Sequence, residues 1–123
     1  MYLVDTNIFL EVLLAQEKSE VCKSFLDDNV PELHLSDFSL HSIGVILYRN
    51  NKQEVFQDFY NDISPIISIV TLKKYYSILE NSLKFDLDFD DSYQYCVAKE
   101  NGLIIITMDK DFSKVKDINV SFI

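Results

Sequence analysis

The sequence predicts an α/β fold, a three-layer sandwich in which helices flank a mostly parallel central sheet of four to five strands. Short apolar runs that suit buried strands alternate with longer segments in which apolar residues recur at helical spacing. Three of these runs end on a carboxylate, at Asp5, Asp37 and Asp109. Because the carboxyl ends of parallel strands meet at one edge of a sheet, these acids are expected to lie close together.

The first strand and two helices follow from the opening residues. Tyr2 to Asp5 is an apolar run of strand length, and Thr6 or Asn7 is placed to cap the helix that follows. A second amphipathic helix is expected from Ser19 to Asn29. Pro31 ends this helix because proline has no backbone N–H to continue the hydrogen-bond ladder.

The rest of the chain repeats the same alternation. Leu33 to Ser36 forms the second strand, and Ser36 or Asp37 caps the helix after it. Asn101 and Gly102 form a helix stop signal before the last long apolar run. The further elements are expected at Lys52 to Asn61 (helix), Ile66 to Val70 (strand), about Leu72 to Leu83 (helix), about Asp90 to Glu100 (helix), Leu103 to Thr107 (strand) and Val120 to Phe122 (edge strand).

Length and composition indicate one domain over residues 1–123, since 48% hydrophobic residues are enough for a core in a chain of this size. The net charge is −9, from 20 acids against 11 bases. An acidic surface repels a phosphate backbone, so the charge disfavours a simple nucleic-acid-binding module. The exception is a site whose bound divalent cations cancel part of the charge and contact phosphate themselves.

Targeting signals are not recognisable in the chain. The opening segment carries Asp5 and Glu11 and lacks a basic leader, so it does not read as a signal peptide. No stretch approaches the roughly 18 uncharged apolar residues of a membrane span. Cys22 and Cys96 have neither CxxC spacing nor a nearby histidine, and they are interpreted as free buried thiols in a reducing compartment. A cytoplasmic location is therefore expected.

The acids at the strand ends point to a metal site. Asp90 and Asp91 precede the third of the acid-terminated runs, so a cluster of carboxylates is expected at one edge of the sheet. Ionised carboxylates held close together repel, and either their pKa values rise or a hard divalent cation neutralises them.

Two blocks at opposite ends of the chain resemble the PIN domain family, and within it the small VapC-type toxins. The segment YLVDTNIFLEVL is similar to the family's opening strand and D-T-N turn, with Asp5 as the first acid. The segment FDDSYQYCVAKENGLIIITMDKDF is similar to the closing block, in which a helix acid precedes an alanine and a glycine and a strand leads into T-x-D. Spacing to Ala98 and Gly102 matches Asp91 to the helix acid.

The resemblance implies hydrolysis of RNA phosphodiester bonds by an endoribonuclease that uses Mg²⁺ or Mn²⁺. It assigns the catalytic and metal-binding roles to Asp5, Asp91 and Asp109. An antitoxin protein that restrains the nuclease, and a homodimer, are the partners it implies. Further candidates are Asp37 and Asp90 as ligands, Asn7 and Thr107 as residues that orient the ligands, and Asp111 without an assigned role.

One position departs from the family pattern. Family members usually carry a glutamate six residues after the serine that closes the second strand, and counting from Ser36 lands on Ser42. Asp37 is a candidate to supply the missing carboxylate, and His41 is a candidate to ligate Mn²⁺ or contact phosphate. The alternative function is therefore a degenerate PIN-like protein that binds RNA, metal or a protein partner without cleaving.

Each candidate also has a structural interpretation. An aspartate at a strand-to-helix turn is commonly an N-cap, and a single histidine in an apolar helix is commonly structural. Asp86 and Asp88 are interpreted as solvated loop residues and helix-dipole partners. A protein-interaction module for a basic partner and, with less support, a phosphoacceptor domain are the other classes considered. Packing or interface roles are expected for the tyrosines Tyr75, Tyr76, Tyr93 and Tyr95.

Overall fold

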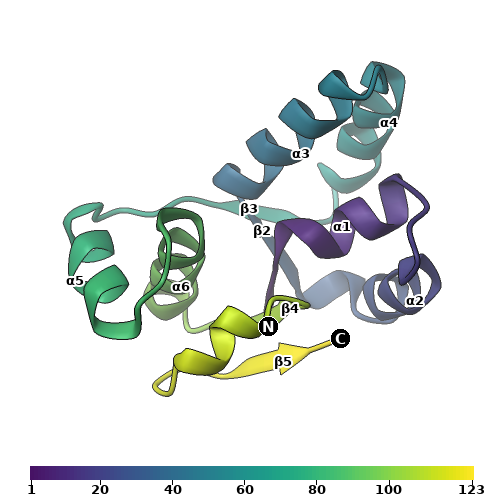
Figure 1. The fold of residues 1–123 in the computed structure, drawn as a ribbon. Coiled ribbons are helices and arrows are strands. Elements are labelled where there is room, and N and C mark those ends of the chain that lie inside the picture. The colour runs from purple at the N-terminus through teal and green to yellow at the C-terminus, as the bar shows by residue number, and fades with distance from the viewer.

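The computed structural model describes residues 1–123 and contains a five-stranded sheet with the strand order β3-β2-β1-β4-β5 (Figure 1). All four neighbouring pairs of strands are parallel, and Leu3 of the central strand lies between His34 and Ile105. The predicted fold class is confirmed, including the last strand at the edge of the sheet. The strands are β1 (Tyr2–Val4), β2 (Leu33–Ser36), β3 (Ser68–Val70), β4 (Ile104–Thr107) and β5 (Val120–Phe122).

Helices cover both faces of this sheet (Figure 1). Successive side chains of a strand point to opposite faces, so Leu3 and Ile105 join a core with α5 and α6, whereas Val4 and Ile106 join a core with the first four helices. The helices are α1 (Thr6–Leu13), α2 (Ser19–Asp28), α3 (Asp37–Arg49), α4 (Gln53–Ile63), α5 (Tyr76–Phe85) and α6 (Phe89–Asn101), with short 3₁₀ turns η1 (Val30–Glu32) and η2 (Lys110–Lys114). No helix combines the length and the apolar composition that crossing a membrane requires.

The pairing of β1 with β4 places two site-bearing chain segments side by side. Val4 is in register with Ile106, and the Asp5 amide donates a 2.9 Å hydrogen bond to the Ile106 carbonyl. Asp5 therefore follows β1 at the same edge of the sheet where Thr107 ends β4. The first and last blocks of the sequence meet at this edge.

Two predicted boundaries were wrong. The N-cap of α1 is Asp5, whose carboxylate accepts from the Thr6 amide at 2.9 Å, and not Thr6 or Asn7. Helix α5 begins at Tyr76 and not near Leu72, because the amides of Leu72 and Lys73 donate to side chains of α6.

The third strand is also shorter than the apolar run that predicted it. β3 begins at Ser68, since the amides of Ile66 and Ile67 still donate to the Ile63 carbonyl at the end of α4. Pro31 lies inside the 3₁₀ turn η1, after α2 has ended at Asp28. Both cysteines are free and buried, as expected from their spacing.

Candidate metal centre

Asp5 lies at the carboxyl end of β1, and both of its carboxylate oxygens have partners. The Thr107 hydroxyl donates to Oδ2 at 2.7 Å, while the Thr6 amide and the Gln94 side-chain amide donate to Oδ1 at 2.9 and 3.3 Å. The side chain is 8% exposed, and this burial raises the pKa of Asp5 above its usual range against the opposing effect of the hydrogen bonds. The result is a carboxylate with a fixed orientation.

Asp91 lies in the first turn of α6 and is as buried as Asp5. Burial raises the pKa of Asp91 to about 8, and the nearby charge of Asp109 adds to the shift, followed by the charges of Asp88 and Asp5. The amide of Asp91 donates to the Asp88 carboxylate at 2.8 Å, which makes Asp88 the N-cap of the helix. Without a cation, this site therefore retains a proton near neutral pH.

Asp109 follows β4 and is held through its backbone. Its amide donates to the Thr107 hydroxyl oxygen at 2.9 Å, so the same threonine contacts both Asp5 and Asp109. One carboxylate oxygen of Asp109 accepts from the Asp111 amide at 2.9 Å and caps η2.

Three carboxylates converge closely enough to share a cation. Oxygen atoms of Asp91, Asp109 and Asp111 all lie within 4.8 Å of one another. Carboxylate oxygens are the hard ligands that Mg²⁺ and Mn²⁺ prefer, so the residues present fit a divalent cation. Asp111 thereby joins the cluster, although the sequence had left its role open.

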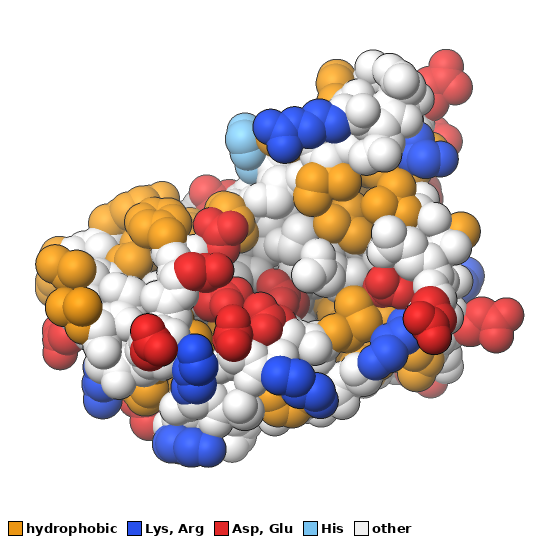
Figure 2. Space-filling view, viewed as in Figure 1, with side chains coloured by type: hydrophobic (Ala, Val, Ile, Leu, Met, Phe, Trp, Pro, Cys, Tyr) orange, Lys and Arg blue, Asp and Glu red, His pale blue; other side chains and the backbone are white.

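The cluster opens into a hollow of about 290 Å³ at the carboxyl edge of the sheet. Figure 2 shows acidic side chains gathered in the middle of this face, beneath the protruding pair α3 and α4. The hollow includes Ser42 from α3, at the position where the family's glutamate is expected. Its other polar lining residues are Asp5, Thr6, Asn7, Asp88, Asp90, Asp91, Gln94 and Asp109.

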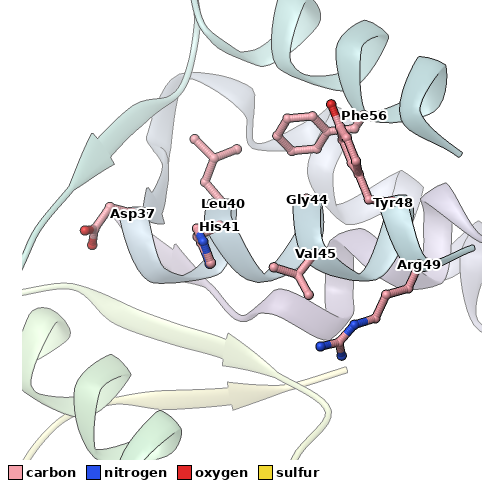
Figure 3. A pocket seen from close by; sticks show the side chains of 8 residues that line it. All are labelled: Asp37, Leu40, His41, Gly44, Val45, Tyr48, Arg49 and Phe56. Carbon is pink, nitrogen blue, oxygen red and sulfur yellow. The ribbon is translucent and has the colours of Figure 1, made fainter. Parts of the chain in front are cut away.

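Asp37 and His41 are not brought to this hollow. The Asp37 carboxylate accepts a 2.6 Å hydrogen bond from the Tyr93 hydroxyl. Both residues instead line a separate and more open hollow of about 710 Å³ along α3, together with Gly44 and with Phe56 of α4 (Figure 3). The structure thus gives α3 no carboxylate that faces the cluster of Asp91, Asp109 and Asp111.

A buried polar network beneath Asp5 was missed by the sequence analysis. Gln94 is 1% exposed, and its amide nitrogen donates to the Ser39 hydroxyl oxygen at 2.8 Å as well as to Asp5. Its amide oxygen accepts from the Ser36 hydroxyl at 2.7 Å. The available signal was a glutamine within the otherwise apolar run YQYCVA, three residues after Asp91 and so on nearly the same side of the helix.

The acids before α6 divide between two environments. The Asp86 side chain is fully exposed, as expected for a solvated loop. Asp88 acts as the expected helix-terminus partner, and it also lines the acidic hollow. The rings of Tyr93 and Tyr95 are buried in the core, whereas Tyr75 and Tyr76 are exposed.

The fold is shared with several solved structures. A toxin–antitoxin complex from Klebsiella pneumoniae aligns with a TM-score of 0.79 at 18% identity, covering 96% of this chain and 95% of that chain. DNA-bound VapBC from Salmonella typhimurium aligns with a TM-score of 0.80 at 13% identity, covering 98% and 96%. VapC20 from Mycobacterium tuberculosis, described as a sarcin-ricin-loop-cleaving toxin, aligns with a TM-score of 0.78 at 16% identity, covering 92% and 93%.

Sequence comparison agrees with the fold. No curated protein matches the chain, but the family model of the PIN domain matches residues 2–118. PIN proteins are typically nucleases that use divalent metal ions, which is consistent with the carboxylate cluster at the sheet edge. The match spans nearly the whole chain, from β1 to the residues just before β5, and this chain therefore belongs to the PIN domain family.

Proposed function

We propose that this protein is a divalent-metal-dependent endoribonuclease that hydrolyses RNA phosphodiester bonds, and that it is the toxin of a toxin–antitoxin pair. The cluster of Asp91, Asp109 and Asp111 beside the buried Asp5 carries this proposal, because it offers the oxygen ligands that such chemistry requires. Support for the substrate class comes from VapC20, which is described as a sarcin-ricin-loop-cleaving toxin.

Asp5, Asp91 and Asp109 are the proposed ligands, and Asp111 completes the set that the geometry brings together. Bound Mg²⁺ or Mn²⁺ would supply Lewis-acid activation of water and neutralise negative charge at the scissile phosphate. Thr107 orients Asp5 through its hydroxyl and Asp109 through the backbone amide. Asp90 and Asn7 line the same hollow and are proposed to contact the hydrated ion or the substrate.

Charge in the hollow links cation binding to proton release. Because its pKa is raised to about 8, Asp91 keeps its proton near neutral pH and gives it up when the cluster binds a cation. Loss of this proton exposes the carboxylate as a ligand. Cation binding also offsets the repulsion between an RNA phosphate and a chain of net charge −9.

A cleavage assay with one matched pair of variants tests the proposal. Purified protein is incubated with single-stranded and structured RNAs in Mn²⁺, Mg²⁺ or EDTA. Asp5→Asn removes a ligand charge while keeping a residue that caps α1 well, so the fold is expected to survive. Asp58→Asn removes the same charge from an exposed position on α4.

Cleavage that requires the metal, survives in Asp58→Asn and disappears in Asp5→Asn is the expected result. Unchanged cleavage in a folded Asp5→Asn variant would reject the assigned site. Folded wild-type protein that binds Mn²⁺ in calorimetry but cuts none of the RNAs would reject the nuclease.

That last outcome would favour the degenerate alternative, in which the protein binds RNA, metal or a protein partner without cleaving. Ser42 motivates this alternative, because it faces the hollow where the family usually supplies a carboxylate. Robust turnover by the wild type would eliminate it.

Two protein partners belong to the proposal. An antitoxin is supported by solved neighbours that are toxin–antitoxin complexes, and it would lie across hydrophobic and acidic surfaces of the chain. Affinity purification of a tagged Asp5→Asn variant from its native host tests this. A small DNA-binding protein as the main partner is expected, and recovery of the chain alone would contradict it.

A homodimer is proposed to bury the apolar face of α5. Figure 2 shows hydrophobic side chains gathered over this helix at the left of the molecule. Leu79 and Leu83 are 68% and 76% exposed, which is unusual for large apolar side chains on one helix. Light scattering is expected to give a dimer for the wild type and a monomer for Leu83→Lys; a monomeric wild type would contradict this proposal.

A further inference from the structure

Gln94 is a neutral side chain and the most buried of the polar residues that line the acidic hollow. It is 1% exposed, and both ends of its amide are hydrogen-bonded. The nitrogen donates to Asp5 at 3.3 Å and to Ser39 at 2.8 Å, and the oxygen accepts from Ser36 at 2.7 Å. One amide therefore connects the start of α3 to the first acid of the site.

The start of α3 is itself held firmly. Ser36 ends β2 and caps the helix, because its hydroxyl oxygen accepts from the Ser39 amide at 3.0 Å. The Ser39 hydroxyl oxygen also accepts from the Thr6 hydroxyl at 2.8 Å, and Thr6 is the residue next to Asp5. These contacts surround Gln94 with groups whose positions are set by a strand end and a helix cap.

An amide is the group that suits this position. It supplies a donor to the Asp5 carboxylate and an acceptor to the Ser36 hydroxyl in one side chain. An apolar side chain of the same size would leave those buried groups unpaired, which costs free energy and releases Asp5 from one of its contacts. A carboxylate at this position would repel Asp5.

We propose that Gln94 is a positioning residue for Asp5. Gln94 holds the Asp5 carboxylate in a fixed position relative to Ser36 and Ser39, and in this way it sets the affinity of the hollow for a divalent cation. The junction of β2 with α3, a helix that has Ser42 in place of an acid, thereby acts on the site through the hydroxyls of Ser36 and Ser39, which contact the Gln94 amide of α6. The inference rests on the proposed function in one respect, because both take Asp5 to be a ligand of the divalent cation.

Calorimetric titration with Mn²⁺ tests the inference without relying on cleavage. Gln94→Met keeps the size of the side chain and removes the amide, and it is expected to weaken Mn²⁺ binding about tenfold, as is usual when a residue that orients a ligand is removed. Tyr95→Phe is the matched control. Tyr95 is the next residue on α6 and is fully buried, and its hydroxyl donates to Asp117 at 2.8 Å. Removing this hydroxyl lowers stability but removes no contact of Asp5.

A second variant separates positioning from general destabilisation. Ser36→Ala removes the hydroxyl that donates to Gln94 and is expected to weaken Mn²⁺ binding severalfold in the wild-type background. In the Gln94→Met background, Ser36→Ala is expected to leave Mn²⁺ affinity unchanged, because the amide that links Ser36 to Asp5 has already been removed. Ser36→Ala should lower the melting temperature in both backgrounds, since Ser36 also caps α3.

The outcomes separate this inference from the nuclease proposal. If Gln94→Met binds Mn²⁺ as tightly as the wild type, the inference is overturned whatever the RNA assay shows. If Gln94→Met does not fold, Ser36→Ala takes its place, and unchanged Mn²⁺ affinity in that variant overturns the inference. An equal loss of affinity in Tyr95→Phe overturns it as well, because the effect would then follow stability. Mn²⁺ binding that depends on Gln94 in a protein that cuts no RNA supports the inference and rejects the nuclease.

Discussion

The Tyr93 hydroxyl donates a 2.6 Å hydrogen bond to Asp37, and this contact joins the middle of α6 to the first residue of α3. The same hydroxyl oxygen accepts from the Leu72 amide at 3.1 Å. Burial and the bond to Asp37 raise the pKa of Tyr93 above its usual range, so the hydroxyl stays protonated and remains a donor. Asp37 thus holds two helices together outside the acidic hollow.

Removing the Tyr93 hydroxyl is expected to affect stability and not metal binding. Tyr93→Phe should lower the free energy of unfolding by about 1 to 3 kcal/mol, because a hydrogen bond to a charged partner is lost and the Leu72 amide is left without its acceptor. Urea unfolding measures this loss, and calorimetry should show unchanged Mn²⁺ affinity. A tenfold weaker affinity would instead mean that Asp37 acts at the metal site.

The Thr107 hydroxyl is expected to matter for metal binding. Thr107→Val keeps the shape of this buried side chain but removes the donor to Asp5 and the acceptor for the Asp109 amide. Mn²⁺ affinity should fall about tenfold. Thr107→Ser keeps the hydroxyl and serves as the control; equal losses in the two variants would show that methyl packing, and not the hydroxyl, is responsible.

The raised pKa of Asp91 predicts how the stability of the metal-free protein depends on pH. Its folded-state pKa of about 8 lies above the ordinary value of 3.8, so the folded state binds a proton that the unfolded state releases. The contribution of Asp91 to the free energy of unfolding in EDTA should therefore decrease as the pH rises from about 4 to about 8.

Asp91→Asn provides the comparison for this pH dependence. Denaturant unfolding in EDTA across that pH range should show that the free energy of unfolding falls less steeply with pH in the variant than in the wild type. Asp5, whose pKa is also raised, should account for part of the remaining pH dependence. Saturating Mn²⁺ should offset the decline in the wild type. Identical slopes for wild type and variant would contradict the raised pKa.

Restoring a carboxylate on α3 is expected to strengthen metal binding at a cost in stability. Ser42→Glu adds an acid to the hollow and should raise Mn²⁺ affinity, while repulsion from Asp91 and Asp109 lowers the melting temperature in EDTA. Gln57→Glu adds the same charge at an exposed position of α4 and should change neither quantity appreciably. Unaltered Mn²⁺ affinity in Ser42→Glu would show that this position lies outside ligand reach.

Much of the fold was predictable because its determinants are local. Strand-length apolar runs, helical periodicity and the stop at Asn101 and Gly102 reflect side-chain patterning and backbone preferences within a few residues. The same local order placed Asp5 and Asp109 after strands and Asp91 in the first turn of a helix. These positions, with the motifs around them, were enough to identify the family.

Contacts between distant segments decided which polar groups share the site. The sequence by itself determined the order of the elements and the acids that end them, whereas the parallel pairing of β1 with β4 decided that Thr107 would hold Asp5. Tertiary packing also brought Asp111 to the cluster and drew Asp37 away from it. Hydrogen bonds between residues far apart in the chain leave no periodic pattern in the sequence. Several acids have similar neighbours in the sequence, so only the folded structure decides which of them lie together in the site.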